Sequence, residues 1–240
     1  MYNDFIHAIK IITPYTLGGI FLLVYISEHI YPQRKDLIDY KHDLINILIG
    51  LINMALVFIA GFYFQQFIEY TTAHHFGILQ WLKLPFLAGL FFGFLLIDCF
   101  MYWWHRANHV IPFFWLFHKY HHKDEKMNST TAVRFHTGEL ILSYAVRIIV
   151  FPLLGVSLAP LLLHSFILFP VIVFHHSNIK IKMEKDLWLR FFIVTPQMHR
   201  LHHSVIKYDT DSNYSSILPY WDMIFRTYHK KSDKPIKFGI

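Results

Sequence analysis

The chain has 240 residues, of which 55% are hydrophobic, 18% aromatic and only 16% charged, and its formal net charge is +6. Low charge combined with long apolar runs is typical of membrane proteins and excludes an ordinary soluble domain or a disordered chain. The single cysteine, Cys99, excludes an intramolecular disulfide and any four-cysteine zinc or iron–sulfur site. A metal site in this chain must therefore be built from histidine, with or without oxygen ligands.

The apolar runs predict an all-α bundle that crosses a membrane several times within one domain, residues 1–240. The first residues lack the signals of a removable signal peptide. Residues 138–174 are too many for one helix, and Gly155, Ser157 and Pro160 predict a break. We expect a hairpin of two short helices there, with a re-entrant or interfacial pair as the alternative. Three other runs are each long enough to cross about 30 Å of hydrocarbon as a helix: residues 11–31, 44–68 and 85–104.

The polar segments that follow the spans, residues 105–137 and 175–240, are expected to form a helical cap on one membrane surface. Of the 22 Lys and Arg residues, 19 fall in these two segments or in the link at 31–43. Because positive charge favours the cytoplasmic side, we expect the cap to be cytosolic, at a bacterial inner membrane or the endoplasmic reticulum. Arg147 lies within an apolar run, where a charge is costly, and is predicted to face the bundle interior.

Ten of the 18 histidines gather in four short clusters. Histidines at i and i+4, or at i, i+3 and i+4, project from one side of a helix and can present several imidazoles to one point. Imidazole suits iron, zinc, copper and nickel. The clusters are one HxxxH, two HxxHH and one HH: His105 and His109; His118, His121 and His122; His199, His202 and His203; His175 and His176.

Nine or ten clustered imidazoles are too many for one ion, because zinc usually takes four ligands and octahedral ions take six. The number predicts two metals. A zinc site that only stabilises the cap is the alternative. Asp98, two helical turns before His105, and Asp222 are predicted to orient metal-bound imidazoles as hydrogen-bond acceptors, although a cap or turn role would also explain Asp222.

The remaining histidines are given structural or solvent-exposed roles. His164 lies in an apolar run and is expected to pack in the core, and His136 is equally compatible with a role next to the metal site and a structural one. The isolated histidines are His7, His29, His42, His74, His75 and His229.

The ordered motifs resemble the fatty acid hydroxylase (sterol desaturase) superfamily of membrane diiron enzymes, over about residues 85–228. The matching stretches are Asp98-x3-Tyr102-x2-His105-Arg106-x2-His109, Leu116-Phe117-His118-Lys119-Tyr120-His121-His122, Arg134-Phe135-His136, His176-Ser177-Asn178, Thr195-Pro196-Gln197-Met198-His199-Arg200-x-His202-His203-Ser204, and Asn213-Tyr214 through Trp221-Asp222. The resemblance implies nine iron ligands and ranks His175 below them: His105, His109, His118, His121, His122, His176, His199, His202 and His203.

The same resemblance implies dioxygen-dependent hydroxylation or desaturation of a C–H bond in a fatty acyl, sterol or isoprenoid lipid, with two iron ions as cofactor. Zinc can substitute for iron in purified protein. The chain carries no dinucleotide fingerprint, so we expect a separate electron donor, a ferredoxin or b-type cytochrome with its reductase, and no nucleic-acid partner. The alternative function is a non-catalytic membrane metal-binding protein or a metal transporter.

Overall fold

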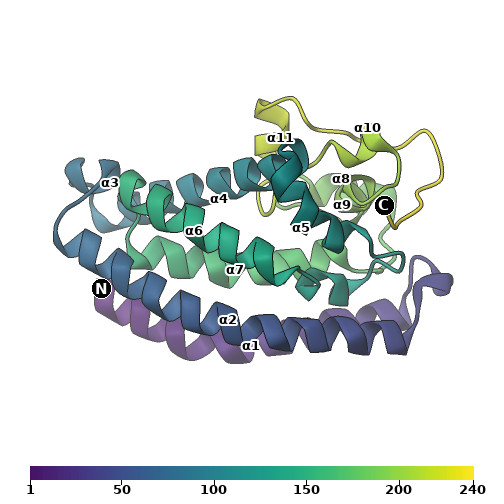
Figure 1. Cartoon of the computed structure of the whole chain (residues 1–240), viewed down its shortest axis with the longest axis horizontal. Coiled ribbons are helices and arrows are strands. Elements are labelled where there is room, and N and C mark those ends of the chain that lie inside the picture. Colours follow the sequence, from purple (N-terminus) through teal and green to yellow (C-terminus); the bar gives the residue numbers. More distant parts are fainter.

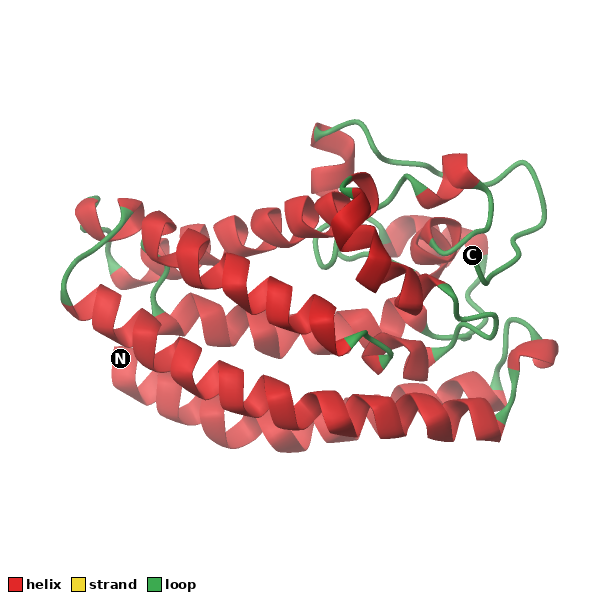
Figure 2. Ribbon diagram, in the orientation of Figure 1, coloured by secondary structure: helices red, strands yellow, loops and turns green.

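The computed structural model describes all 240 residues as an elongated bundle of helices with no strand, confirming the predicted all-α class (Figures 1 and 2). Five helices are long and apolar enough to cross a membrane. The chain is therefore an integral membrane protein. The helices are α1 (Tyr2–Ile30), α2 (Tyr40–Ala73), α3 (Ile78–Trp81), α4 (Phe86–Val110), α5 (Pro112–His122), α6 (Thr137–Leu154), α7 (Leu158–His176), α8 (Met183–Leu189), α9 (Pro196–His202), α10 (Lys207–Thr210) and α11 (Tyr220–Ile224), with 3-10 turns η1 (Lys35–Leu37) and η2 (Ser129–Val133).

Helices α1 and α2 both run along the length of the molecule (Figure 1), α1 packed against α7 and α2 packed against α6. Large apolar side chains point away from the bundle: Leu22 is 57% exposed and Phe58 76% exposed. Such exposure in water would be costly, but hydrocarbon is a suitable solvent for these side chains. Both helices are longer than the predicted spans 11–31 and 44–68, because helical hydrogen bonding continues into flanking polar residues that hydropathy does not count.

The third span also ends later than predicted. Helix α4 continues past residue 104 to Val110, so His105 and His109 lie on the spanning helix and not in a segment that follows it. The HxxxH pair is thereby held by an element whose other end lies at the far end of the bundle. This is a correction to the boundary between the third span and the cap.

The predicted hairpin is present, as helices α6 and α7 with a break at Gly155. Gly155 ends α6 in the left-handed conformation, at φ 73°. A side chain is also excluded at the neighbouring turn, because a Cβ on Gly77 would lie 2.1 Å from the carbonyl oxygen of Pro152. Each helix has the length and composition to cross the membrane, which favours two spans over a re-entrant pair.

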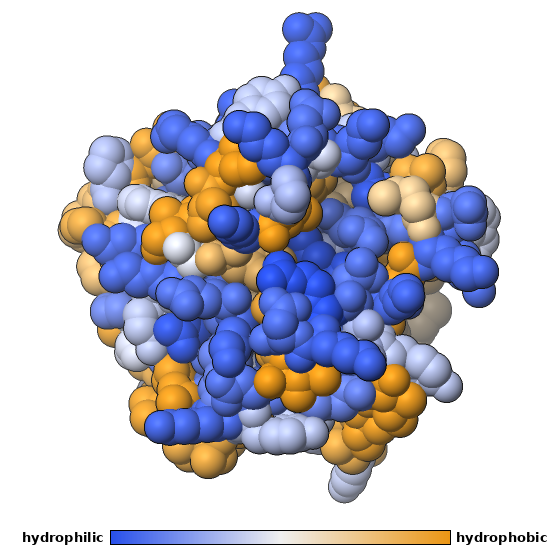
Figure 3. Space-filling view, turned by 90° about the vertical axis from the view of Figure 1, so that its right-hand side faces the viewer, coloured by the Kyte–Doolittle hydropathy of each residue, from blue (hydrophilic) through white to orange (hydrophobic).

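The two halves of the bundle have different interiors. Near the α6–α7 turn the core is apolar, and Phe64, Ile68, Ile97 and Phe151 are buried there. At the other end, buried polar side chains predominate, and α5 and α8 to α11 form a loop-rich cap (Figure 2). Seen end-on, this cap presents a mainly hydrophilic surface (Figure 3).

Carboxylates on α1 and α2 anchor the cap to the spans. Glu28, 2% exposed, accepts hydrogen bonds from the backbone N–H of Ser129 and of Asn178. Asp43 accepts from the amide of Asn128 at 2.6 Å. These charge-assisted bonds hold η2 and the segment after α7 against the first two helices.

Candidate metal centre

The structure brings together all nine predicted ligands in two adjacent groups, in each of which one ring nitrogen per histidine lies within 4.8 Å of the others. The first group consists of His105, His109, His118, His122 and His202. The second group consists of His121, His176, His199 and His203.

Two short helices supply most of these imidazoles. Helix α5 begins at Pro112 and helix α9 at Pro196, a residue suited to the first helical position because it has no N–H to satisfy there. Thr195 caps α9 by accepting the N–H of Met198. The local sequence thus starts each helix at the point that places its HxxHH motif in the last turn.

Each HxxHH motif is shared between the two groups. On α5, His118 and His122 join the first group and His121 the second. On α9 the division is reversed, since His202 joins the first group and the other two histidines join the second. Residues at i and i+4 share one side of a helix, while i+3 lies on the other side of the same face. One turn of helix can therefore contribute to two metals.

Five of the nine rings donate their Nδ1–H to a fixed acceptor, four of them to backbone carbonyls and the fifth, that of His118, to the carboxylate of Glu139. His105 donates to the carbonyl of Tyr214 at 2.8 Å, His202 to that of Ser212 at 2.8 Å. His176 donates to Ile172 at 2.8 Å, and His121 to Arg134 at 3.2 Å. A carbonyl oxygen only accepts, so the proton lies on Nδ1 and the Nε2 lone pair is free to bind a metal.

The free nitrogens face one another. Nε2 of His176 lies 3.0 Å from Nε2 of His121, although both rings carry their proton on Nδ1. Nε2 of His199 also lies 3.0 Å from Nε2 of His176. Lone pairs facing each other at this distance repel unless a cation lies between them. Two nitrogens about 2.1 Å from one metal and at right angles are about 3.0 Å apart, so the second group fits a metal ion.

Buried nitrogens without partners give the same result for the first group. Nε2 of His109, His118 and His202 is buried and makes no hydrogen bond, and both ring nitrogens of His122 are unpartnered. An unpaired buried polar atom costs about 1–3 kcal/mol. Several of them around one point fit a metal that removes this cost.

Burial keeps these imidazoles neutral. Desolvation lowers the pKa of His202 to about 3 and holds the pKa of His121, His122, His199 and His203 well below the usual value. Nearby imidazoles add to this effect. Neutral imidazole is the form that binds a metal, so the site is prepared for cations at neutral pH.

Glu139 is a functional residue that the sequence reasoning missed. Its Oε1 accepts the Nδ1–H of His118 at 2.9 Å, and its side chain is buried at the start of α6. This is a carboxylate–histidine pair of the kind that orients metal ligands. The available signal was the placement of a carboxylate in the first turn of a predicted span, where it would otherwise be costly.

The prediction that Asp98 orients a ligand imidazole is wrong. Its oxygens accept from Nε2 of His164 at 3.2 Å, from the backbone N–H of Leu218 at 3.1 Å and from the indole N–H of Trp221 at 2.8 Å. Asp98 therefore ties α4 to α7, to α11 and to the segment before α11. The spacing argument failed because two turns of helix separate Asp98 from the ring of His105, and His164 is the nearer donor.

Asp222 supports the site one step away. It accepts the N–H of Tyr214 at 2.8 Å and of Ser215 at 3.0 Å, and the carbonyl of Tyr214 in turn accepts from His105. The predicted direct contact with an imidazole is absent, because Asp222 closes the turn that carries the acceptor. The turn role is correct.

His136 and His175 belong to neither group. His136 is exposed, and its Nδ1 accepts the N–H of Gly138, which caps α6. His175 is buried and stacks on His199, with the ring centroids 4.0 Å apart. Its role is to pack against a member of the second group. His164 is buried as predicted, but as a partner of Asp98.

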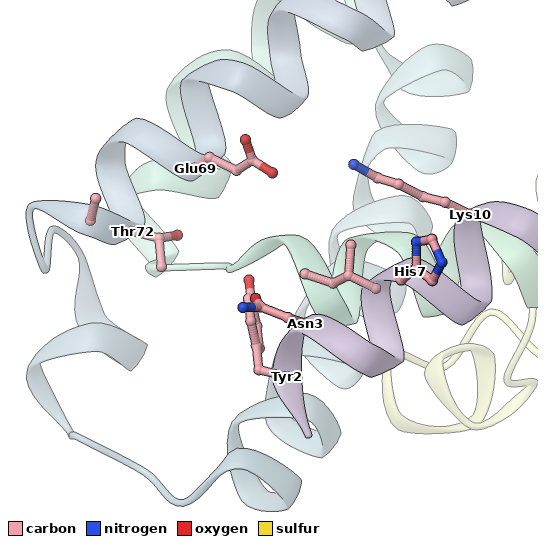
Figure 4. A pocket seen from close by; sticks show the side chains of 8 residues that line it. Tyr2, Asn3, His7, Lys10, Glu69 and Thr72 are labelled. Atoms are coloured by element: carbon pink, nitrogen blue, oxygen red, sulfur yellow. The ribbon is translucent and has the colours of Figure 1, made fainter.

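A cavity of about 190 Å³ adjoins both groups. His105 and His118 line it from the first group, and three members of the second group line it as well. From the histidines it extends between α4, α6 and α7, where its wall is largely apolar and includes Leu140, Leu168 and Ile172. A second, wide-open cavity lies at the opposite end, between the start of α1 and the end of α2, and contains no member of either group (Figure 4).

A family comparison agrees with this arrangement. Residues 90–227 match the model of the family described as fatty acid hydroxylase. The chain belongs to the fatty acid hydroxylase family. The match contains both histidine groups and Glu139, and it leaves α1 and α2 outside.

Curated relatives of this fatty acid hydroxylase chain include enzymes that act on lipids. An alkylglycerol monooxygenase from Danio rerio is 33% identical over 60% of the chain and 31% of the relative. The ornithine lipid hydroxylase OlsE from Rhizobium tropici is 27% identical over 65% of the chain and 45% of the relative. The chain thus spans about a third to a half of the length of these relatives. A very-long-chain aldehyde decarbonylase, GL1-5, from Oryza sativa subsp. indica is 26% identical. No solved structure matches the chain.

Proposed function

We propose that this chain is a dioxygen-dependent diiron hydroxylase or desaturase that oxidises a C–H bond of a membrane lipid. The observation that carries the proposal is the pair of Nε2 atoms, of His121 and His176, that face each other at 3.0 Å while both protons lie on Nδ1. This arrangement is favourable only around a cation. Two such groups side by side fit two metals.

The residues divide into those that would hold iron and those that would orient the holders. The five histidines of the first group would together bind one ion, and the four histidines of the second group would together bind the other. Glu139 and the carbonyls of Tyr214, Ser212, Arg134 and Ile172 keep the rings in the tautomer that leaves Nε2 free. When bound, two iron ions supply the activation of dioxygen that C–H oxidation requires.

The chain itself positions the lipid and excludes water. The cavity is lined by ligand histidines at one end and, along its length, by apolar side chains such as Leu140, Leu168 and Ile172 together with polar side chains of α6. A lipid chain in this cavity would have a C–H bond beside both groups, and burial of the histidines keeps bulk water away from the reacting carbon. The names of the relatives, a monooxygenase and a lipid hydroxylase, support this reaction class.

An electron donor and a cytoplasmic cap complete the proposal. Exposed cations such as Lys123, Lys182 and Lys185 lie on the cap, and an acidic ferredoxin or b-type cytochrome would dock there by charge complementarity. Turnover with a reduced carrier should then fall with added salt and with charge reversal at these lysines. A transporter is less well supported, because the histidines lie at the cap end of the spans and not midway along them.

The test is to load the purified full-length chain with iron, measure metals per chain, and compare the lipids of cells that express the wild type or a ligand variant. Two metals per chain and an oxidised lipid that requires dioxygen are expected. Lys83→Gln, a cation remote from both groups, is the matched control. Full activity with at most one metal per chain, or metal transport into vesicles without dioxygen uptake, would refute the proposal.

A further inference from the structure

Arg147 lies in the middle of a membrane-spanning helix, and its charged side chain has no carboxylate partner. It lies in α6, its Nη2 contacts the sulfur of Met101 at 3.2 Å, and its guanidinium carbon lies 5.8 Å from the centroid of the Tyr144 ring. Its Nε is buried without any partner. A thioether and an aromatic face do not neutralise a cation, and a charge within the membrane usually marks a binding path.

The buried carboxylates of α4 and α6 are engaged elsewhere. Asp98 accepts from His164, Leu218 and Trp221, and Glu139 accepts from His118. Arg147 forms no ion pair, whereas the buried Arg190 has Asp186 at 2.6 Å. The contrast shows that the fold supplies a carboxylate to one buried arginine and leaves this one free.

Arg147 also faces the cavity that reaches the histidines. Glu139, Ser143 and Arg147 are spaced four residues apart, share one face of α6 and all line this cavity. Glu139 contacts a proposed metal ligand, and eight residues of helix place Arg147 about 12 Å further along the axis. The cation therefore lies at one end of the cavity and the histidines at the other, and the wall between them includes Ser143 and the apolar side chains of Leu140 and Leu168.

We propose that Arg147 binds the carboxylate of a single-chain lipid acid whose apolar chain extends along the cavity to the two histidine groups. This rests on the proposed function and specifies its substrate class. A guanidinium binds a carboxylate through two parallel hydrogen bonds, and one negative charge cancels one positive charge. The volume of about 190 Å³ is below the range of about 300–1,000 Å³ that is usual for ligand pockets. A small anionic end with one chain fits such a space better than a bulky head group with two chains.

This binding mode also predicts where oxidation occurs. Because the carboxylate is held about 12 Å along the helix from Glu139, the oxidised carbon lies several bonds from the acid group. Oxidation next to the carboxylate is not expected.

The experiment measures equilibrium binding of dodecanoate, 1-dodecanol and dodecyl phosphate to the full-length chain in a neutral detergent, corrected for empty micelles. In the wild type we expect dodecanoate to bind about 10–100-fold more tightly than the alcohol, the range for loss of a charged hydrogen bond. Arg147→Gln should abolish this preference, and Arg147→Lys should retain part of it. Met101→Leu, which removes only the sulfur contact, and Lys83→Gln should preserve it.

Equal binding of acid and alcohol by the wild type would overturn the proposal, and this comparison needs no variant to fold. An unchanged preference in Arg147→Gln would also overturn it, as would tighter, Arg147-dependent binding of dodecyl phosphate. The readout is separate from the proposed oxidation. A chain that oxidises lipids without an acid preference refutes only the role of Arg147, and a chain that binds the acid without oxidising any lipid refutes only the diiron function.

Discussion

The two histidine groups differ in how firmly protein atoms hold them. In the first group, three of five rings donate Nδ1–H to fixed acceptors, and one acceptor is the Glu139 carboxylate. In the second group, two of four rings do so, both to backbone carbonyls. The second group has fewer imidazoles, and three of its four rings line the cavity.

This difference indicates a division of work between the two proposed metals. Five imidazoles leave one position open on an octahedral ion, while four leave two. We therefore expect the second group to hold the more accessible metal and the first group to hold the more tightly bound one. Five substitutions, grouped in four predictions, test this contrast.

The largest effect is expected from removing a ligand from either group. His105→Ala and His121→Ala should each lower activity more than about 100-fold, which exceeds the effect of losing an orienting partner. Each variant should retain one metal per chain and still insert in the membrane. Metal analysis of purified protein checks this, and a variant that keeps two metals and wild-type activity would remove that histidine from the ligand set.

The second largest effect is expected from Glu139→Gln. The amide can still accept from His118 but carries no charge, so metal affinity or activity should fall about 10–100-fold. The loss should concern the first group only. Titration with a chelator measures it: in the wild type the second group should release its metal first, and in this variant the order should reverse. An unchanged order would contradict the contrast drawn above.

A smaller effect is expected from Asp222→Asn. The substitution weakens the turn that places the Tyr214 carbonyl against His105, without touching an imidazole. Activity should fall by no more than about 10-fold, the lower limit for direct orienting partners. The metal affinity of each group is measured in the variant and in the wild type. If only the second group loses metal, Asp222 acts by another route.

The smallest effect on activity is expected from Asp98→Asn. Both metals and most of the turnover should be retained, because Asp98 contacts no member of either group. Stability should decrease by about 1–3 kcal/mol, since one buried N–H loses its charged acceptor. Thermal unfolding in detergent measures this. Loss of one metal outright would restore Asp98 to the site.

The sequence by itself determined the membrane class, the break near Gly155 and the four histidine clusters, because hydropathy and helical spacing are local properties of the chain. The choice of nine ligands among the ten clustered histidines came from the resemblance to the family. The sequence also predicted correctly that Arg147 faces protein, where it contacts Met101. Only the tertiary structure decided how the nine divide into two groups. That division depends on the rotation of α5 and α9 relative to α4 and α7. An HxxHH motif is compatible with either choice, because its i and i+4 histidines can face the first metal, as on α5, or the second, as on α9. The choice of Glu139 over Asp98 as the partner of an imidazole has the same origin, since it depends on which helix lies opposite the ring and not on spacing within one helix.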